Sequence, residues 1–176
     1  MAIVPIRLAP DPVLRQKAKR VKFFDSSVQK LIEDMRETMH AAEGVGLAAP
    51  QVGVPLRVVV IGLPEQEDFA LINPQIVNKI GERMVSEGCL SIPGYVGEVK
   101  RAIAVTVKAR DPDGKEIRIK GEELLAHALE HEIDHINGVL YIDHLESPDK
   151  LKKLEPGEGG AKSATASKVK TKKGLV

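Results

Sequence analysis

The sequence predicts an α+β fold in which mainly antiparallel strands pack around a central helix that carries an HExxH motif, with a second helix nearer the N-terminus. Two helical patterns flank a block of strand-like runs and do not alternate with them, which favours a largely antiparallel sheet over a doubly wound fold. The chain has 176 residues, 43% of them hydrophobic and 29% charged. This balance is typical of one globular domain.

The N-terminal helix is predicted over residues 25–43. Apolar side chains recur from Val28 to Ala42 at spacings of three and four, which places them on one face. Asp25 offers an N-cap oxygen, and Gly44 stands where a C-terminal cap favours a left-handed residue. The stretch 44–53 that follows lacks helical amphipathicity, and its glycines allow a backbone to approach closely.

The strand-like runs lie between the two helices. Apolar and β-branched residues fill 57–63, two shorter runs flank Asn73-Pro74, and alternation marks 99–109. A turn signal follows at 111–114 (DPDG), and residues 115–120 alternate again. These last two features predict a hairpin.

The second helix is predicted over residues 122–137, with an apolar stripe and a stop at Gly138. The fold is expected to end near Leu154, so that residues 1–154 form one domain. Residues 155–176 hold five lysines, two glutamates and many small residues. They cannot bury an apolar surface, so we expect a disordered basic tail.

Composition excludes several classes of protein. Lys plus Arg number 26 and Asp plus Glu 25, and only five residues are Phe or Tyr, so no sequence-specific nucleic-acid binding is expected. No stretch approaches the ~20 apolar residues of a membrane span, and no secretory signal is evident. The one cysteine, Cys89, excludes an intrachain disulfide. The expected location is the cytoplasm.

Residues 131–135 (HEIDH) carry the strongest chemical signal. On a helix, His131 and His135 lie about 40° apart around the axis and about 6 Å along it, so both imidazoles can reach one ion. Glu132 can project toward a metal-bound water, an arrangement typical of metal-assisted hydrolysis. The alternative is a solvated helix with incidental histidines.

A catalytic metal site usually takes three protein ligands and leaves one position open. His127 cannot complete this one, because it lies about 12 Å along the helix from His135; we expect it to line a pocket near the site. Cys89, between Gly88 and Pro93 in an extended piece, is the remaining candidate. A thiolate and two imidazoles would make a tetrahedral site with one open position.

Two protease patterns fit less well. The metzincin pattern needs a third histidine at position 141, which is Tyr141, and His144 falls three residues late. A gluzincin would use a downstream glutamate, but Glu155 and Glu158 lie in or beside the tail. Both readings are weakened, and a zincin-type metallopeptidase stays as an alternative.

Three motifs together resemble the peptide deformylase family, whose members remove the formyl group from the initiator methionine of new bacterial chains. They are residues 44–51 (GVGLAAPQ), 87–91 (EGCLS) and 131–135 (HEIDH), in the family's order, and the similarity covers roughly residues 3–146. The resemblance implies an α+β metallohydrolase that releases formate from the N-terminal formylmethionine of nascent polypeptides.

The resemblance also implies roles for matching residues. Three match the metal ligands: Cys89, His131 and His135. Three match catalytic groups, namely Glu132 as general acid/base and Gln51 with the backbone N–H of Leu90 as donors to the formyl oxygen. Seven fall around the substrate: Gly44, Val45, Gly46, Glu87, Leu124, His127 and Ala128. The first three match an edge strand that pairs with the peptide.

One divalent metal ion per chain is implied. Ferrous iron is the metal the family is known for in cells, and zinc, nickel or cobalt also suits thiolate and imidazole. The implied partners are formyl-Met N-termini. The basic tail itself suggests weak ribosome association, with a merely solubilising end as the alternative. The sequence departs from the family at Pro50 and His127. Lys100 and Arg101 are two candidates for the basic residue that some members use near the substrate chain. A non-catalytic member that binds metal or peptide is the second alternative.

Overall fold

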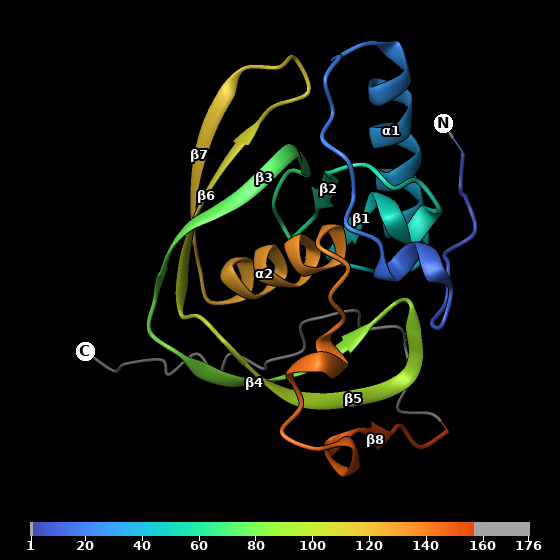
Figure 1. The fold of residues 1–176 in the computed structure, drawn as a ribbon, viewed down its shortest axis with the longest axis vertical. Coiled ribbons are helices and arrows are strands. Elements are labelled where there is room, and N and C mark those ends of the chain that lie inside the picture. The colour runs from blue at the N-terminus through green and yellow to red at the C-terminus, as the bar shows by residue number, and fades with distance from the viewer. Residues whose placement is uncertain (1, 157–176) are drawn as a thin grey trace.

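The computed structural model describes residues 2–156 (Figure 1). Five strands form one antiparallel sheet in the order β1-β2-β3-β6-β7, and three form a second in the order β4-β5-β8. The first sheet comprises β1 (Gly46–Ala48), β2 (Val58–Ile61), β3 (Phe69–Ile80), β6 (Ala104–Arg110) and β7 (Glu116–Glu122). The second comprises β4 (Arg83–Cys89), β5 (Ile92–Arg101) and β8 (Lys152–Lys153). The helices are α1 (Ser26–Ala41) and α2 (Leu124–Ile136).

The predicted class, mostly antiparallel strands with two helices, is confirmed. Strand β2 shows how the layers form, because all four of its residues are buried. Val58 and Val60 pack in the cluster that contains the apolar face of α1, whereas Val59 and Ile61 pack in the cluster that contains α2. Alternate side chains of a strand point to opposite faces. The five-stranded sheet is therefore covered by a different helix on each face.

Helix α1 begins as predicted, with the Asp25 side chain accepting from the backbone N–H groups of Ser27 and Val28. Its end differs from the prediction. The helix stops at Ala41, and the left-handed residue is Glu43, with φ 55°, not Gly44. The backbone N–H of Gly44 instead donates to the Met39 carbonyl at 2.9 Å. The helix ends before the apolar pattern does, so the left-handed residue comes one position earlier in the sequence than predicted.

Two of the strand predictions need correction. The runs on either side of Asn73-Pro74 form one strand, β3, with a register shift between Ile72 and Gln75 against β6. A bulge accommodates a proline, which has no N–H to donate. The predicted 99–109 strand is divided between the end of β5 and β6. Strand β4 was not predicted, because its polar residues hide the alternation of its buried ones.

Helix α2 and the hairpin before it follow the prediction. The helix ends at Ile136, and Gly138 has φ 75°; a Cβ there would lie 2.7 Å from the Arg15 carbonyl oxygen. Figure 1 shows α2 in front of the five-stranded sheet, with β4 and β5 below it. The last described contact is the Leu154 N–H donating to the Gly94 carbonyl. Residues 157–176 of the predicted tail lie outside the described residues.

No helix within residues 2–156 is long and apolar enough to cross a membrane.

Candidate metal centre

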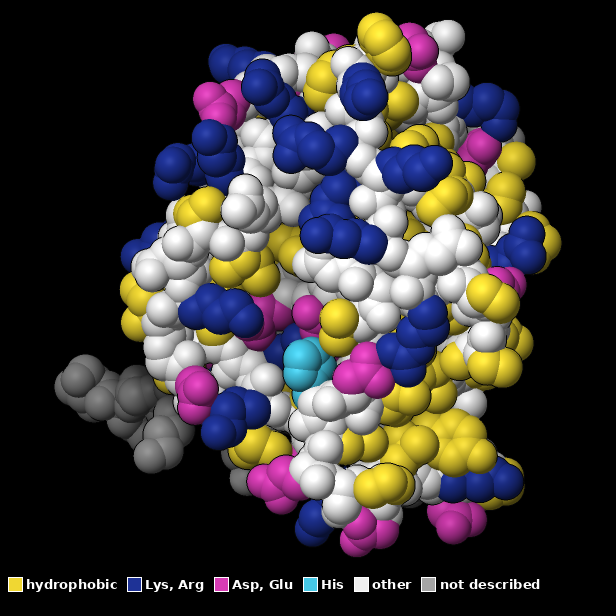
Figure 2. All heavy atoms as spheres, in the orientation of Figure 1, with side chains coloured by type: hydrophobic (Ala, Val, Ile, Leu, Met, Phe, Trp, Pro, Cys, Tyr) yellow, Lys and Arg dark blue, Asp and Glu magenta, His cyan; other side chains and the backbone are white. Residues whose placement is uncertain are grey.

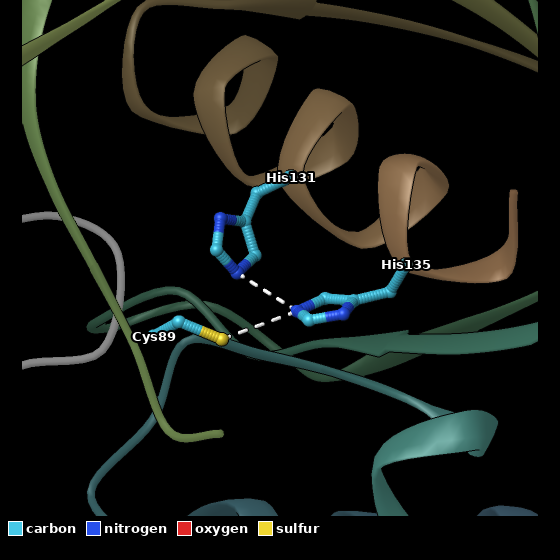
Figure 3. A group of neighbouring side chains, drawn as sticks. All are labelled: Cys89, His131 and His135. Atoms are coloured by element: carbon cyan, nitrogen blue, oxygen red, sulfur yellow. Dashed lines mark hydrogen bonds between the residues drawn. The ribbon is translucent and has the colours of Figure 1, made fainter. Parts of the chain in front are cut away.

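Three donor side chains converge where the end of β4 meets α2. Figure 3 shows the Cys89 side chain directed toward His135, below His131; the two histidines project from successive turns of the helix. The Cys89 Sγ lies 3.3 Å from His135 Nε2, and the two histidine Nε2 atoms lie 3.1 Å apart. All three residues are buried, and their donor atoms lie within 4.8 Å of one another.

The donor set fits a divalent metal. Sulfur and nitrogen ligands bound tetrahedrally at about 2.3 and 2.0 Å lie about 3.3 to 3.6 Å apart, close to the separations seen between these atoms. Burial alone would lower the pKa of His131, but the charges of Glu87 and Cys89 raise it well above its usual range. A metal ion would therefore displace a proton from His131 as it binds.

Glu132 lies beside this group and is buried. Burial is the main reason that the pKa of Glu132 rises to about 7. Its Oε2 has no hydrogen-bond partner among the described residues, which suits a carboxylate that faces a water or substrate. A Cβ at position 46 would lie 2.6 Å from the Glu132 Oε1, so only glycine lets β1 approach the carboxylate so closely.

Gln51 stands on the other side of Cys89. Its Oε1 accepts from the Ala48 backbone N–H at 2.9 Å, while its Nε2 donates to Ser91 Oγ at 3.2 Å and lies 3.7 Å from Cys89 Sγ. Pro50 fits without loss, because it stands in the first turn of the 3₁₀ helix Ala49–Val52, where an N–H is not needed. Leu90 follows Cys89 directly in the turn between β4 and β5.

Glu87, which was predicted among the residues around the substrate, is fully buried beside the metal donors. Its carboxylate contacts His131 Nδ1, pairs with Arg101 (Nη2 to Oε1, 2.6 Å) and lies 2.9 Å from His127 Nε2. Burial would raise the pKa of Glu87, but His131, His127 and Arg101 hold it well below its usual range. The contact with His131 is of the kind by which carboxylates orient histidines around metal sites.

Arg101, one of the two basic residues considered for the substrate chain, is also buried. Its side chain is 3% exposed, and its Nη1 donates to Asp134 Oδ2 at 2.7 Å in addition to the bonds with Glu87. Asp134 in turn lies 2.8 Å from His144 Nε2. Sequence reasoning missed this network. The only sequence signal was one arginine and one glutamate, Arg101 and Glu87, on adjacent strands. Their pairing becomes visible only when β4 and β5 are aligned.

The remaining substrate-pocket candidates separate into two groups. Gly46 lies on the edge strand β1, directly after Gly44 and Val45, and the apolar side chains of Val45, Leu124 and Ala128 share one cluster. His127 is 3% exposed, and its Nε2 lies 2.9 Å from the Glu87 carboxylate. Two residues that sequence reasoning left out also border the site: Ser91, and Tyr141, whose ring stacks on His131 at 6.4 Å between centroids.

Comparisons with known proteins agree with this geometry. The family model described as polypeptide deformylase matches residues 3–151. A peptide deformylase of Dehalococcoides mccartyi is 57% identical over 159 residues, which cover 90% of this chain and 95% of that protein. One from Thermomicrobium roseum is 46% identical, covering 95% of this chain and 100% of that protein.

Solved structures give the same result. The crystal structure of a peptide deformylase from Legionella pneumophila has a TM-score of 0.82 and 53% identity, covering 85% of this chain and 89% of that chain. The enzyme from Synechococcus elongatus in complex with actinonin has a TM-score of 0.81 and 41% identity, with 85% and 82% covered. By sequence, fold and site geometry, the chain belongs to the polypeptide deformylase family.

Proposed function

We propose that this chain removes the N-formyl group from the N-terminal formylmethionine of nascent polypeptides and releases formate, using one divalent metal ion held by Cys89, His131 and His135. The observation that carries the proposal is the convergence of one thiol and two imidazoles within 4.8 Å, beside a buried glutamate. The family's activity supports the reaction. In this proposal α2 is the central scaffold, and residues 1–154 are the catalytic domain.

The metal is ferrous iron in cells in this proposal, and zinc, nickel or cobalt can replace it because the same ligands suit them. When bound, it supplies Lewis acidity and lowers the pKa of a bound water. One thiolate and two neutral imidazoles leave a divalent ion with a net positive charge. Glu87 supports the site by fixing His131 through Nδ1, which leaves Nε2 for the metal.

Glu132 is the general base and then the general acid. A carboxyl with a pKa of about 7 exchanges protons readily near neutral pH. In the first step Glu132 accepts the proton of the attacking water, and in the second it gives this proton to the leaving amine nitrogen. The Gln51 amide and the Leu90 N–H donate to the formyl oxygen as negative charge develops there. Ala48 holds the Gln51 side chain in place.

The substrate is the N-terminus of a nascent chain. In this proposal the segment Gly44, Val45 and Gly46 pairs with the peptide as an edge strand, because β1 has a strand neighbour on one side only. Val45, Leu124 and Ala128 would contact the methionine side chain, since they share one apolar cluster. The reaction takes place in the cytoplasm, and the lysines of residues 155–176 contribute weak ribosome association.

Formate release from a formyl-Met tripeptide tests the proposal. Glu132→Gln should keep the metal and lower kcat/KM about 10²- to 10⁴-fold, whereas the matched control Glu122→Gln, an exposed residue on β7, should match the wild type. Full activity of Glu132→Gln would contradict the role of Glu132. Cleavage of internal bonds in an unformylated peptide would favour a zincin-type peptidase, and absence of any turnover by the metal-loaded wild type would favour a non-catalytic member.

A further inference from the structure

A second concave site lies between the N-terminal segment, β3 and the end of α2. It is a groove of about 550 Å³, and its polar lining includes Lys17, Arg20, Arg57, Gln75, Lys79 and Asn137. We call it the basic groove. Figure 2 shows Lys and Arg side chains gathered on this face of the molecule. Its volume falls in the range of about 300–1,000 Å³ typical of ligand sites.

The basic groove is separate from the metal centre. None of the three metal-ligand residues lines it. Its helix residue Ile133 is two positions from both His131 and His135 along α2. At about 100° per residue, this places Ile133 about 160° around the helix axis from either histidine. Asp134, the next helix residue in the groove lining, lies about 60° from His131. A ligand in the groove would therefore meet the flank and the back of α2, and Ile133 would separate it from the metal donors.

Three cations in the groove have no carboxylate partner within residues 2–156. Lys17 and Arg20 are exposed. Arg57 donates from Nη1 to the Ile136 carbonyl (3.0 Å) and from Nη2 to Asn137 Oδ1 (2.9 Å), and both acceptors are neutral. Burial lowers the pKa of Arg57, and the nearby charge of Arg20 lowers it further. Arg20, Arg57 and Lys17 line the same groove, and like charges gathered in this way form a region of positive potential.

The other charged groups of the groove do not cancel this potential. Lys79 is neutralised by Glu130 at 2.8 Å. Asp134 is the acidic lining residue, but it already pairs with Arg101 at 2.7 Å and contacts His144 at 2.8 Å. The whole chain carries a formal charge of only +1. The positive charge of the groove is thus a local feature and not a consequence of a basic protein.

We propose that the basic groove binds the phosphate groups of an RNA backbone. Guanidinium and ammonium groups are the usual partners of backbone phosphates. The groove has no aromatic lining residue, so binding would be independent of base sequence and would lack stacking. The choice of RNA over free phosphate rests on the proposed function, because nascent chains are made on a particle built largely of RNA.

The test uses the full metal-loaded chain and a fluorescein-labelled twelve-nucleotide RNA, with binding followed by polarisation. Lys17→Gln/Arg20→Gln removes two groove cations. Arg118→Gln/Lys120→Gln is the matched control, because it removes one Arg and one Lys from exposed positions on β7. The groove variant should bind RNA at least tenfold more weakly than the wild type, and the control should bind as the wild type does. All three should release formate from a formyl-Met tripeptide equally.

Salt and competition identify the source of the phosphate. Each cation that neutralises a phosphate of a single strand contributes about −0.7 to the slope of log K against log salt. The slope should therefore be near −2 for three cations and fall by about 1.4 in the groove variant. Equal weakening of both double variants, no RNA binding by the wild type, or inorganic phosphate binding as tightly as the oligonucleotide would each overturn the proposal. Deformylation could still be intact in every case.

Discussion

Charged side chains are buried and paired on one side of α2 and exposed on another. On the metal side, Glu87 and Arg101 are buried, and each is satisfied by specific partners at hydrogen-bond distance. On the groove side, Lys17 and Arg20 are exposed, and neither has a carboxylate partner within residues 2–156. Buried charges must be paired because desolvation is costly, whereas water solvates exposed charges and leaves them able to bind a ligand. One helix thus supports a closed site and an open one.

The largest effect is expected from breaking the buried network. Arg101→Met leaves Glu87 and Asp134 without their guanidinium partner, and losing one member of a buried pair costs about 3–5 kcal/mol. Urea unfolding of the metal-free variant measures this loss. A loss below about 1 kcal/mol would mean that the network does not hold the metal side together.

Glu132 should give the next largest effect, with a defined dependence on pH. The pKa of Glu132 rises from 4.5 to about 7 on folding, so above pH 4.5 the folded state retains a proton that the unfolded state releases. Stability should therefore fall as pH rises from 4.5 to 7, by about 3 kcal/mol. Glu132→Gln should remove this dependence of stability on pH.

Unfolding of metal-free wild type and Glu132→Gln at pH 4.5 and pH 8 checks the sign. The variant should become relatively more stable at pH 8. Parallel pH profiles would show that burial does not perturb Glu132. Glu87 cannot mimic the effect, because its pKa is lowered and its contribution is lost only as pH falls below 4.5.

Substitution of Tyr141 is expected to change the free energy of unfolding by a smaller amount, and to raise it. Its hydroxyl is buried and has no hydrogen-bond partner among the described residues. Tyr141→Phe removes that unsatisfied group and keeps the ring stacked on His131, so the variant should gain about 1 kcal/mol and keep its activity. A destabilised variant would instead reveal a partner for the hydroxyl, such as a bound water.

The smallest effect belongs to the groove. Lys17→Gln/Arg20→Gln removes two exposed charges that make no ion pair within the described chain, so the midpoint of unfolding should be unchanged. A clear shift in either direction would mean that these cations serve the fold and are not held free for a ligand.

Sequence patterns predicted the helices and the shared face of the two histidines because these depend on local spacing. The four-residue interval of His131 and His135 specifies a shared face, and the apolar periodicity of α1 and α2 specifies their buried sides. The network around Glu87 depends instead on the pairing of β4 with β5 and on the packing of both against α2. No local period records that pairing, so the contacts of Glu87 with Arg101 and His131 could not be predicted from the sequence.

The edge of the site was difficult for a related reason. His127 was predicted to line a pocket from its place on the helix. Its contact with the carboxylate of Glu87 could not be predicted, because Glu87 is distant in the sequence. Gly46 was predicted from its motif, and the structure adds the reason for a glycine, which is the approach of Glu132.

Metal stoichiometry of the anaerobically purified chain tests the central claim most directly, because it asks whether Cys89, His131 and His135 form one metal site. The wild type should hold one divalent ion per chain and release formate. Cys89→Ser should lose most of that metal and the activity with it, while Ser91→Ala, which changes a neighbouring buried residue, should keep the metal. A Cys89→Ser variant with full metal content and full activity would contradict the account.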